Sequence, residues 1–376
     1  MPPVPQAVSA VRDAVRAVLA GDPLPVVPPE ISDDDLAAEV VRQRVAGLLV
    51  GVGLRDSVEE SLRSVADVDR MAVLLQVRQM DELACALIDV PWLSIKGPLL
   101  AIQTTSDFAA RGFGDIDVLV SLDDVADVHG RLVDAGWWPY GNFPRPGPSW
   151  AWRHLLRSYC ELPLYGARST VDLHWALAPT RGRLPTFAEA WARREEIPLS
   201  GRRWVTLNRG DALRHACVHA ATDSWRWLRS LVDIYRLASQ EETWSLLEHD
   251  LGPPELTTLR VVRDRIGLPA AVPERVLAAV DDVPRRRLAV AGWGVEMLEN
   301  HDAGNWTTQS LIARLGQSTT MTEGLAAISS AILPAHSLAG VHSAHAAVAI
   351  PQALGRRGRL VTGKARARLR RRARLG

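Results

Sequence analysis

The run of residues 114–120 (GDIDVLV) is the feature that most constrains how this 376-residue chain can fold. Successive side chains of a strand point to opposite faces, so a strand here buries Ile116 and Val118 and turns Asp115 and Asp117 together toward a cleft. Two adjacent carboxylates on one face repel each other unless a cation lies between them. Mg²⁺ prefers carboxylate and phosphate oxygens, so the pattern favours a metal site over an acidic loop end.

Composition is that of an ordinary soluble globular protein, with 47% hydrophobic and 23% charged residues, and the length allows two or three domains. The net charge of +1 hides an asymmetry. Residues 356–376 hold ten of the 44 Lys and Arg residues and no Asp or Glu, which leaves the rest of the chain at about −9. This tail is either a solvated extension or a segment that contacts nucleic acid or an anionic surface through residues 356–374.

The three cysteines lie far apart and form neither a CxxC pair nor a zinc-ligand spacing. A disulfide framework is therefore not expected, and the expected location is the reducing cytoplasm. The N-terminus lacks the pattern of a signal peptide, and we expect no transmembrane segment. Lysine occurs only at Lys96 and Lys364, whereas Arg supplies the other 42 basic residues. Because Arg is the default cation here, Lys96 stands out as a compact point charge.

Apolar periodicity and turn residues divide the chain into four regions. Helices are expected at 8–19, 33–49 (with Ser32 as N-cap), 58–88, 99–104, 122–135, 210–222 and 225–238, and strands at 92–95, 116–120, 158–164 and 170–175. The expected organisation is an N-terminal helical region (1–90), an α/β core (91–205), a C-terminal helical domain (206–350) and a basic tail (351–376).

Two further segments of the core carry candidate site residues. Alternation in the strand at 171–175 (VDLHW) buries Val171 and Leu173 and places Asp172 and His174 on the other face, where Asp172 would add a third carboxylate. The turn at Lys96-Gly97 feeds a helix N-terminus, which is a natural place for a phosphate. Arg111 precedes the aspartate pair and could hold a phosphate oxygen or brace the carboxylates.

Together these motifs resemble the bacterial, uncharacterised nucleotidyltransferase family of the superfamily with the polymerase-beta-like fold. The resemblance covers roughly residues 90–240. It rests on Ile95-Lys96-Gly97, Arg111-x-x-Gly114-Asp115-Ile116-Asp117-Val118-Leu119-Val120, Gly136-Trp137, Val171-Asp172-Leu173-His174-Trp175, His215-x-x-x-His219 and Leu228–Asp233. It implies an α+β fold, with a small mixed-sheet core flanked by N-terminal and C-terminal helical regions.

The resemblance also implies a reaction, in which an NMP moves from an NTP, such as ATP, to an acceptor hydroxyl. Asp115, Asp117 and Asp172 would be the catalytic residues and would bind Mg²⁺ or Mn²⁺ in a two-metal mechanism. Nucleotide and phosphate contacts would come from Lys96, Gly97, Arg111 and Gly114. The acceptor could be a small molecule, a peptide, a protein or an RNA. One departure concerns the glycine turn, since no Ser follows Gly97 and Asp115 comes eighteen residues after it.

Several interpretations stay open at the sequence level. His215 and His219 lie one helical turn apart and could bind zinc, line the cleft or pack between helices. His174 could support Asp172 or hydrogen-bond across the sheet, and Asp233 is expected to brace an Arg or a helix. The alternative functions are a catalytically silent nucleotide-binding protein and a nucleic-acid or membrane-surface interaction protein.

Overall fold

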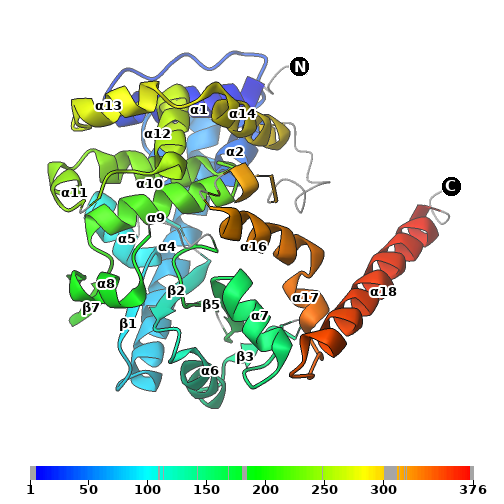
Figure 1. The fold of residues 1–376 in the computed structure, drawn as a ribbon. Coiled ribbons are helices and arrows are strands. Elements are labelled where there is room, and N and C mark those ends of the chain that lie inside the picture. The colour runs from blue at the N-terminus through cyan, green and yellow to red at the C-terminus, as the bar shows by residue number, and fades with distance from the viewer. Residues whose placement is uncertain are drawn as a thin grey trace.

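The structure is a computed structural model. It describes residues 6–372 except 109–110, 113, 142, 168, 180–183, 248, 300–310, 313, 317 and 319, and it describes no side chains at 293–299 or 360–372. Helices surround a small sheet (Figure 1). This arrangement confirms the predicted α+β class with helical regions on both sides of the sheet in sequence.

Five strands form the main sheet in the order β1-β2-β5-β4-β3. Only β2 and β5 run parallel, and the other neighbours are antiparallel, so the sheet is mixed as predicted. The strand bounds are β1 Trp92–Ser94, β2 Asp115–Val120, β3 Trp138–Pro139, β4 Glu161–Tyr165 and β5 Thr170–His174.

The two faces of this sheet differ in chemistry, as the alternation in β2 predicts. Ile116 and Val118 are fully buried in a core that also contains residues of α4 and α6, such as Met80 and Val128. The opposite face carries Leu119, which belongs to a second core built with the C-terminal helices. The carboxylates of β2 lie on that second face, so the sheet presents them toward the helices.

A second sheet, β6 Glu195–Leu199 with β7 Arg202–Thr206, is a hairpin that the periodicity reading missed. Ser200 and Gly201 form its two-residue turn, and both have positive φ, 54° and 77°. Two positive φ values in succession match the hairpin turn that follows the twist of the strands. The Ser-Gly pair was therefore a usable signal for this element.

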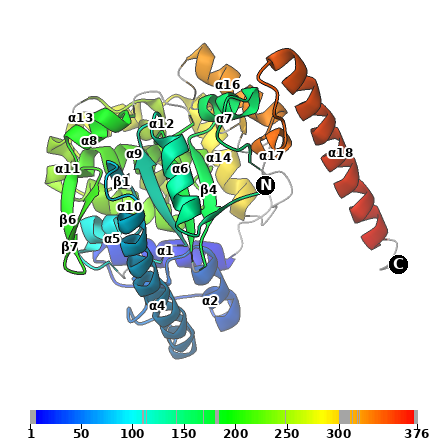
Figure 2. The same ribbon diagram turned by 90° about the horizontal axis from the view of Figure 1, so that it is seen from below.

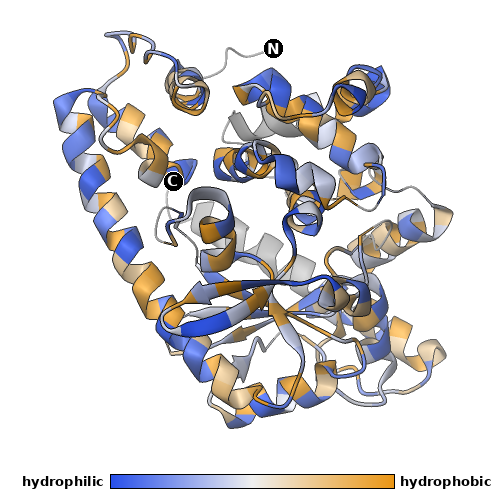
Figure 3. Cartoon of the chain, turned by 90° about the vertical axis from the view of Figure 1, so that its left-hand side faces the viewer, coloured by the Kyte–Doolittle hydropathy of each residue, from blue (hydrophilic) through white to orange (hydrophobic). Residues whose placement is uncertain are grey.

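The helices fall before, between and after these strands, and they carry both hydrophilic and hydrophobic residues (Figure 3). Their bounds are α1 Gln6–Ala20, α2 Asp33–Arg42, α3 Ala46–Leu49, α4 Asp56–Ala86, α5 Gly97–Thr105, α6 Val125–Asp134, α7 Trp150–Ser158, α8 Phe187–Ala192, α9 Arg209–Thr222, α10 Leu228–Ala238, α11 Glu241–Ser245, α12 Pro253–Ile266, α13 Glu274–Asp281, α14 Arg285–Glu299, α16 Met321–Ile332, α17 Ala335–Leu338 and α18 Ala346–Arg372.

Three local predictions need correction. The helix expected at 33–49 begins as predicted, with the Ser32 hydroxyl accepting from the backbone N–H of Asp35, but it ends at Arg42. Arg44 has φ 58°, a left-handed conformation that no α-helix continues through. Residues 158–160 are not strand, because Ser158 ends α7. The helix expected at 225–238 begins only at Leu228, because Trp225 has φ 55°.

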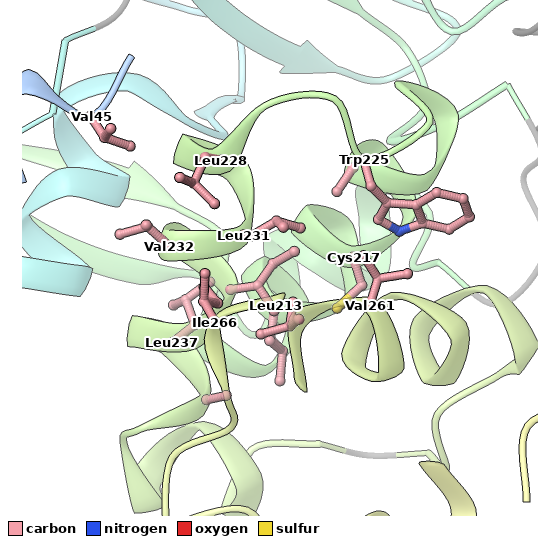
Figure 4. Close-up of a cluster of buried hydrophobic side chains, with 14 of the residues drawn as sticks. Val45, Leu213, Cys217, Trp225, Leu228, Leu231, Val232, Leu237, Val261 and Ile266 are labelled. Atoms are coloured by element: carbon pink, nitrogen blue, oxygen red, sulfur yellow. The ribbon is translucent and has the colours of Figure 1, made fainter. Parts of the chain in front are cut away.

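Helices that precede the main sheet in the sequence share one core with helices that follow it. Val11 of α1 and Leu36 of α2 are buried in the same cluster as residues of α9, α10 and α12. Figure 4 shows the middle of this cluster, where Leu213, Cys217 and Leu231 lie among other apolar side chains. This packing fixes α9 and α10 over the carboxylate face of the sheet.

The last helix, α18, starts against α17 and α7 and then runs away from the rest of the chain (Figures 1 and 2). The basic tail is therefore helical as far as Arg372. Throughout the described residues, every helix falls short of the combined length and apolarity that crossing a bilayer requires.

Candidate active site

A cavity of about 280 Å³ opens between the carboxylate face of the sheet and helices α9 and α10. Its size is near the lower end for small-ligand pockets. It brings together eight of the residues singled out in the sequence, namely Lys96, Arg111, Asp115, Asp117, Asp172, His215, His219 and Asp233. Neither Gly97 nor Gly114 is among the described residues that line it. Gly97 is buried with φ 61°, and Gly114 is exposed with open space at its Cα.

The strand register explains why the three aspartates meet. Asp117 of β2 lies directly opposite Asp172 of the parallel strand β5, and Asp115 precedes Asp117 on the same face. Within the described part of the chain, the carboxylates of Asp115 and Asp172 have no hydrogen-bond or ion-pair partner. Two of the three acidic groups are thus left for a ligand from outside the chain.

Asp117 is the buried centre of the group, with 3% of its surface exposed. Its Oδ1 accepts from Lys96 Nζ at 3.0 Å and lies 3.0 Å from His174 Nε2. Burial opposes ionisation of Asp117, but Lys96 and His174 outweigh it and hold the pKa of this carboxyl well below its usual range. His174 therefore bonds across the sheet to Asp117 and not to Asp172.

The pKa values of Lys96 and His174 are both shifted in favour of the charged form. Burial opposes the charge of Lys96, yet the attraction of Asp117, Glu161 and Asp115 prevails and raises the pKa of its ammonium. Burial likewise opposes protonation of His174, and the contacts with Asp117 and Cys160 outweigh it and raise the pKa of its imidazole well above the usual value. Asp117 is thus a charged carboxylate with a fixed orientation.

Asp172 experiences the opposite environment. Burial, the charge of Glu161 and the charge of Asp117 together raise the pKa of the Asp172 carboxyl to about 8. A carboxyl group that like charges and desolvation push this far gains most from a nearby cation. The electrostatics thus distinguish Asp117, whose charge is compensated, from Asp172, which lacks a counter-charge.

Glu161 and Cys160 were missed at the sequence level, although both flank the site. Glu161 lies on β4 opposite His174, whose Nε2 is 3.4 Å from Glu161 Oε2. Cys160, Glu161 and His174 offer ligand atoms that all lie within 4.8 Å of one another, the one such acidic, histidine or cysteine group found among the described residues. The three aspartates do not meet that limit. Alternation along residues 161–165 could have placed Glu161 on the cleft face, because Leu162 and Leu164 are the buried residues.

Arg111 and Asp233 form a buried ion pair across the cavity wall. Arg111 Nε donates to Asp233 Oδ2 at 2.7 Å, and the two residues are 8% and 3% exposed. Asp233 therefore braces an Arg, as the sequence reading expected. Arg111 joins the segment before β2 to α10 and so positions the strand that carries the aspartate pair.

His215 and His219 both lie on α9 and line the cavity, with ring centroids 6.0 Å apart. Burial, Lys96 and His174 hold the pKa of His215 well below its usual value. Lys96 and then burial do the same to the pKa of His219. Two neutral imidazoles at this wall can accept a hydrogen bond without adding positive charge to the site.

The helix-side wall carries charged residues that the sequence reading did not single out. Arg226, Trp227 and Arg229, at the start of α10, line the cavity together with Arg44 from the turn after α2. Burial and the neighbouring Arg111 lower the pKa of Arg229 to about 9. These residues lie far apart in sequence, and the Arg-rich composition gave no signal that separated them from the other arginines.

A larger cavity of about 1080 Å³ lies beside α8, α12 and α13. Three of its polar residues serve the fold, since Glu189 completes the capping box of α8 with Thr186 and Arg193 binds Asp211 at 2.5 Å. It holds none of the sequence-predicted site residues. The smaller cavity is therefore the better candidate for chemistry.

Comparison with known proteins gives a family but no characterised relative. No curated protein matches the chain. A family model described as an uncharacterised nucleotidyltransferase matches residues 29–259, which is more than half of the sequence and includes every site residue described above. The match confirms the resemblance and extends it at both ends. On this evidence the chain belongs to that family of uncharacterised nucleotidyltransferases.

Proposed function

We propose that the protein is a Mg²⁺-dependent nucleotidyltransferase that moves an NMP from an NTP to an acceptor hydroxyl, using the cavity between the sheet and α9–α10. The observation that carries this proposal is the register of Asp117 against Asp172 on parallel neighbouring strands, with Asp115 two residues before. The family supports a nucleotidyl-transfer reaction and an NTP substrate.

The donor set suits a hard divalent cation. Asp115 and Asp172 are half-buried, line the cavity and have no partner in the described part of the chain. Lys96 and His174 contact only the Oδ1 atom of Asp117, which leaves Oδ2. Carboxylate oxygens are the ligands that Mg²⁺ and Mn²⁺ prefer. Asp115, Asp117 and Asp172 would therefore hold the metal.

A bound divalent cation would supply Lewis-acid activation at the α-phosphate and charge neutralisation of the triphosphate. The chain's own residues set the rest of the reaction. Asp117 keeps a fixed orientation through Lys96 and His174, and the Arg111–Asp233 pair holds the preceding segment in place. Asp172, which lies beside Asp117 on the neighbouring strand, would accept the proton of the acceptor hydroxyl.

The proposal extends to the surroundings of the reaction. The three cysteines Cys85, Cys160 and Cys217 are unpaired, which agrees with a cytoplasmic setting. The acceptor is a small-molecule, peptide, protein or RNA hydroxyl, and the basic residues from 356 onward would attract an anionic one.

Pyrophosphate release tests the proposal. Wild type, Asp117→Asn and Asp123→Asn would each be incubated with Mg²⁺, a cell extract as acceptor source and one of the four NTPs. Asp123 is an exposed aspartate in the loop that follows β2, and it serves as the matched control. We expect release with wild type and Asp123→Asn, and a loss of about 100-fold or more in Asp117→Asn. Equal background in all three proteins, with intact folds, would refute nucleotidyl transfer under these conditions.

A further inference from the structure

Among the described residues, five Lys and Arg side chains line the candidate site, and they differ in whether an acidic side chain pairs with them. Lys96 pairs with Asp117 at 3.0 Å, and Arg111 pairs with Asp233 at 2.7 Å. Arg44 and Arg229, by contrast, form no ion pair within the described part of the chain. The two cationic residues expected from the sequence to meet the triphosphate are thus already neutralised, while Arg44 and Arg229 are not.

The unpaired arginines and their neighbour Arg226 form one surface, which we name the arginine wall (Arg44, Arg226 and Arg229). All three line the same cavity as Asp115, Asp117 and Asp172. The carboxylates come from the sheet and the arginines from the helical side. A ligand that spans this cavity therefore meets oxygen donors at one end and guanidinium donors at the other.

The arginine wall is pre-organised by stacking and by backbone contacts. The guanidinium carbons of Arg44 and Arg226 lie 4.7 and 4.5 Å from the centre of the Trp227 ring, within the range of a cation–π contact. Gln43 ties the two segments together, because its side chain accepts from the N–H of Leu228 and its carbonyl from the N–H of Arg229. The residues that present the guanidinium groups are thereby held before any ligand binds.

Backbone strain concentrates at the same wall. Arg44, Ser224 and Trp225 have φ values of 58°, 57° and 55°, a left-handed conformation that costs free energy in residues other than glycine. The Trp225 indole N–H donates to Thr258 Oγ1 at 2.8 Å, and that hydroxyl donates to the carbonyl of Cys217 at 2.9 Å. These two hydrogen bonds therefore hold the turn before Arg226 in an unfavourable conformation. Such strained turns are common where a side chain must be oriented toward a ligand.

Arg229 has both an unsatisfied hydrogen-bond donor and a poorly compensated charge, which an anion would satisfy. Its Nη1 donates to the carbonyl of Gly112 at 2.5 Å, but its Nε is buried without a hydrogen-bond partner among the described residues. Burial and the charges of Arg111 and Arg44 lower its pKa to about 9, so its cationic form is under-compensated. A phosphate oxygen would supply both the missing acceptor and the missing charge.

We propose that Arg44, Arg226 and Arg229 bind the β- and γ-phosphates of the nucleoside triphosphate and so orient its pyrophosphate leaving group. This inference rests on the proposed function. In the reaction, the acceptor oxygen forms a bond to the α-phosphorus and the bond from that phosphorus to the bridging oxygen breaks. The hydroxyl proton passes to Asp172, and the electron pair of the broken bond leaves on pyrophosphate. Guanidinium groups fit this role because they bind phosphate in a bidentate manner.

The inference also accounts for the unusual turn at Lys96-Gly97-Pro98. Lys96 is taken up by Asp117, and Gly97 does not line the cavity, so that turn leaves the outer phosphates without a partner. The arginine wall supplies one from a different part of the chain. Residues 41–47 and 224–229 thus take over a task that the glycine turn does not perform.

Titration calorimetry with tripolyphosphate and with AMP tests the arginine wall without any turnover. The proteins are wild type, Arg44→Gln, Arg226→Gln, Arg229→Gln and the control Arg203→Gln, an Arg on the exposed hairpin with 76% of its side chain accessible. We expect each wall variant to weaken tripolyphosphate binding about tenfold or more and AMP binding less than threefold, and the control to match wild type. Melting curves identify a misfolded variant. If Arg229→Gln unfolds because its bond to Gly112 is lost, the tripolyphosphate affinity of Arg44→Gln decides the outcome, because Arg44 is exposed.

Two results would overturn the arginine wall. One is a wild-type protein that does not bind tripolyphosphate, and the other is folded Arg44→Gln and Arg226→Gln proteins whose affinity stays within twofold of wild type. Failure of the proposed function looks different. In that case the wall variants lose tripolyphosphate affinity while wild type releases no pyrophosphate from any NTP. Pyrophosphate release combined with unchanged affinity in the variants would reject the wall and leave the proposed function standing.

Discussion

Breaking the buried pair of Arg111 and Asp233 from either side should destabilise the protein unequally. Removing one partner of a buried ion pair typically costs about 3–5 kcal/mol, because the other charge is left without compensation. After Arg111→Met, the cationic Arg229 still attracts Asp233, so we expect a loss near 3 kcal/mol. After Asp233→Asn, the repulsion between Arg111 and Arg229 is no longer offset by Asp233, and we expect a loss of about 5 kcal/mol.

Urea unfolding followed by tryptophan fluorescence measures both losses, and the double variant Arg111→Met/Asp233→Leu completes the cycle. Because the double variant removes both charges of the pair, it should be within about 2 kcal/mol of wild type, far less destabilised than the sum of the single variants. The reasoning fails if Asp233→Asn costs less than 1 kcal/mol, if Arg111→Met is the more damaging change, or if the two losses simply add.

Three further outcomes follow from the structure. Glu59 is buried, but backbone N–H groups of Gly51, Leu54 and Gly53 overcome that burial and lower its pKa. Its stabilisation is therefore complete above the ordinary glutamate pKa of about 4.3 and is lost as the pH falls through the lowered value, so Glu59→Gln should cost about 1–3 kcal/mol in urea at pH 7 and much less at pH 3. Trp225→Phe removes the donor to the buried Thr258 hydroxyl and should lower the free energy of unfolding by about 1–2 kcal/mol by the same method; an unchanged value would mean that this bond does not hold the strained turn. Chelation by EDTA should abolish NTP turnover, with recovery on adding Mg²⁺ or Mn²⁺, and turnover that persists in metal-free buffer would exclude the carboxylate site as a metal centre.

Local pattern was sufficient for the elements that bury one face. The alternation in 114–120 and 171–175 predicted β2 and β5 and the face of their aspartates, because a strand with one buried side has a fixed register. Helical periodicity located α4 closely, yet two of its periodic apolar residues, Val68 and Met71, are exposed. Periodicity shows that a residue shares a face with others, and only the tertiary contacts show whether anything covers that face.

The sheet half of the site was predictable from strand geometry, and the sequence also singled out His215, His219 and Asp233 of the helical half, but not its arginines. Asp115, Asp117 and Asp172 follow from strand geometry, whereas Arg44 and Arg229 reach the same cavity only through the packing of α2 against the start of α10. The pairing of Lys96 with Asp117 was also beyond local reasoning. Lys96 stood out because lysine is rare in this chain, but its position beside Asp117 depends on the antiparallel pairing of β1 with β2.

The most direct test of the central claim is to follow which phosphorus atom of the NTP is transferred. Wild type would be incubated with Mg²⁺, cell extract and NTP labelled either at the α-phosphorus or at the γ-phosphorus, beside Asp117→Asn and Asp123→Asn. Nucleotidyl transfer at the Asp115, Asp117 and Asp172 site predicts acceptor labelling from the α-labelled NTP alone, present in wild type and Asp123→Asn and absent in Asp117→Asn. Labelling from the γ-phosphorus, or α-labelling that survives Asp117→Asn, would contradict the account.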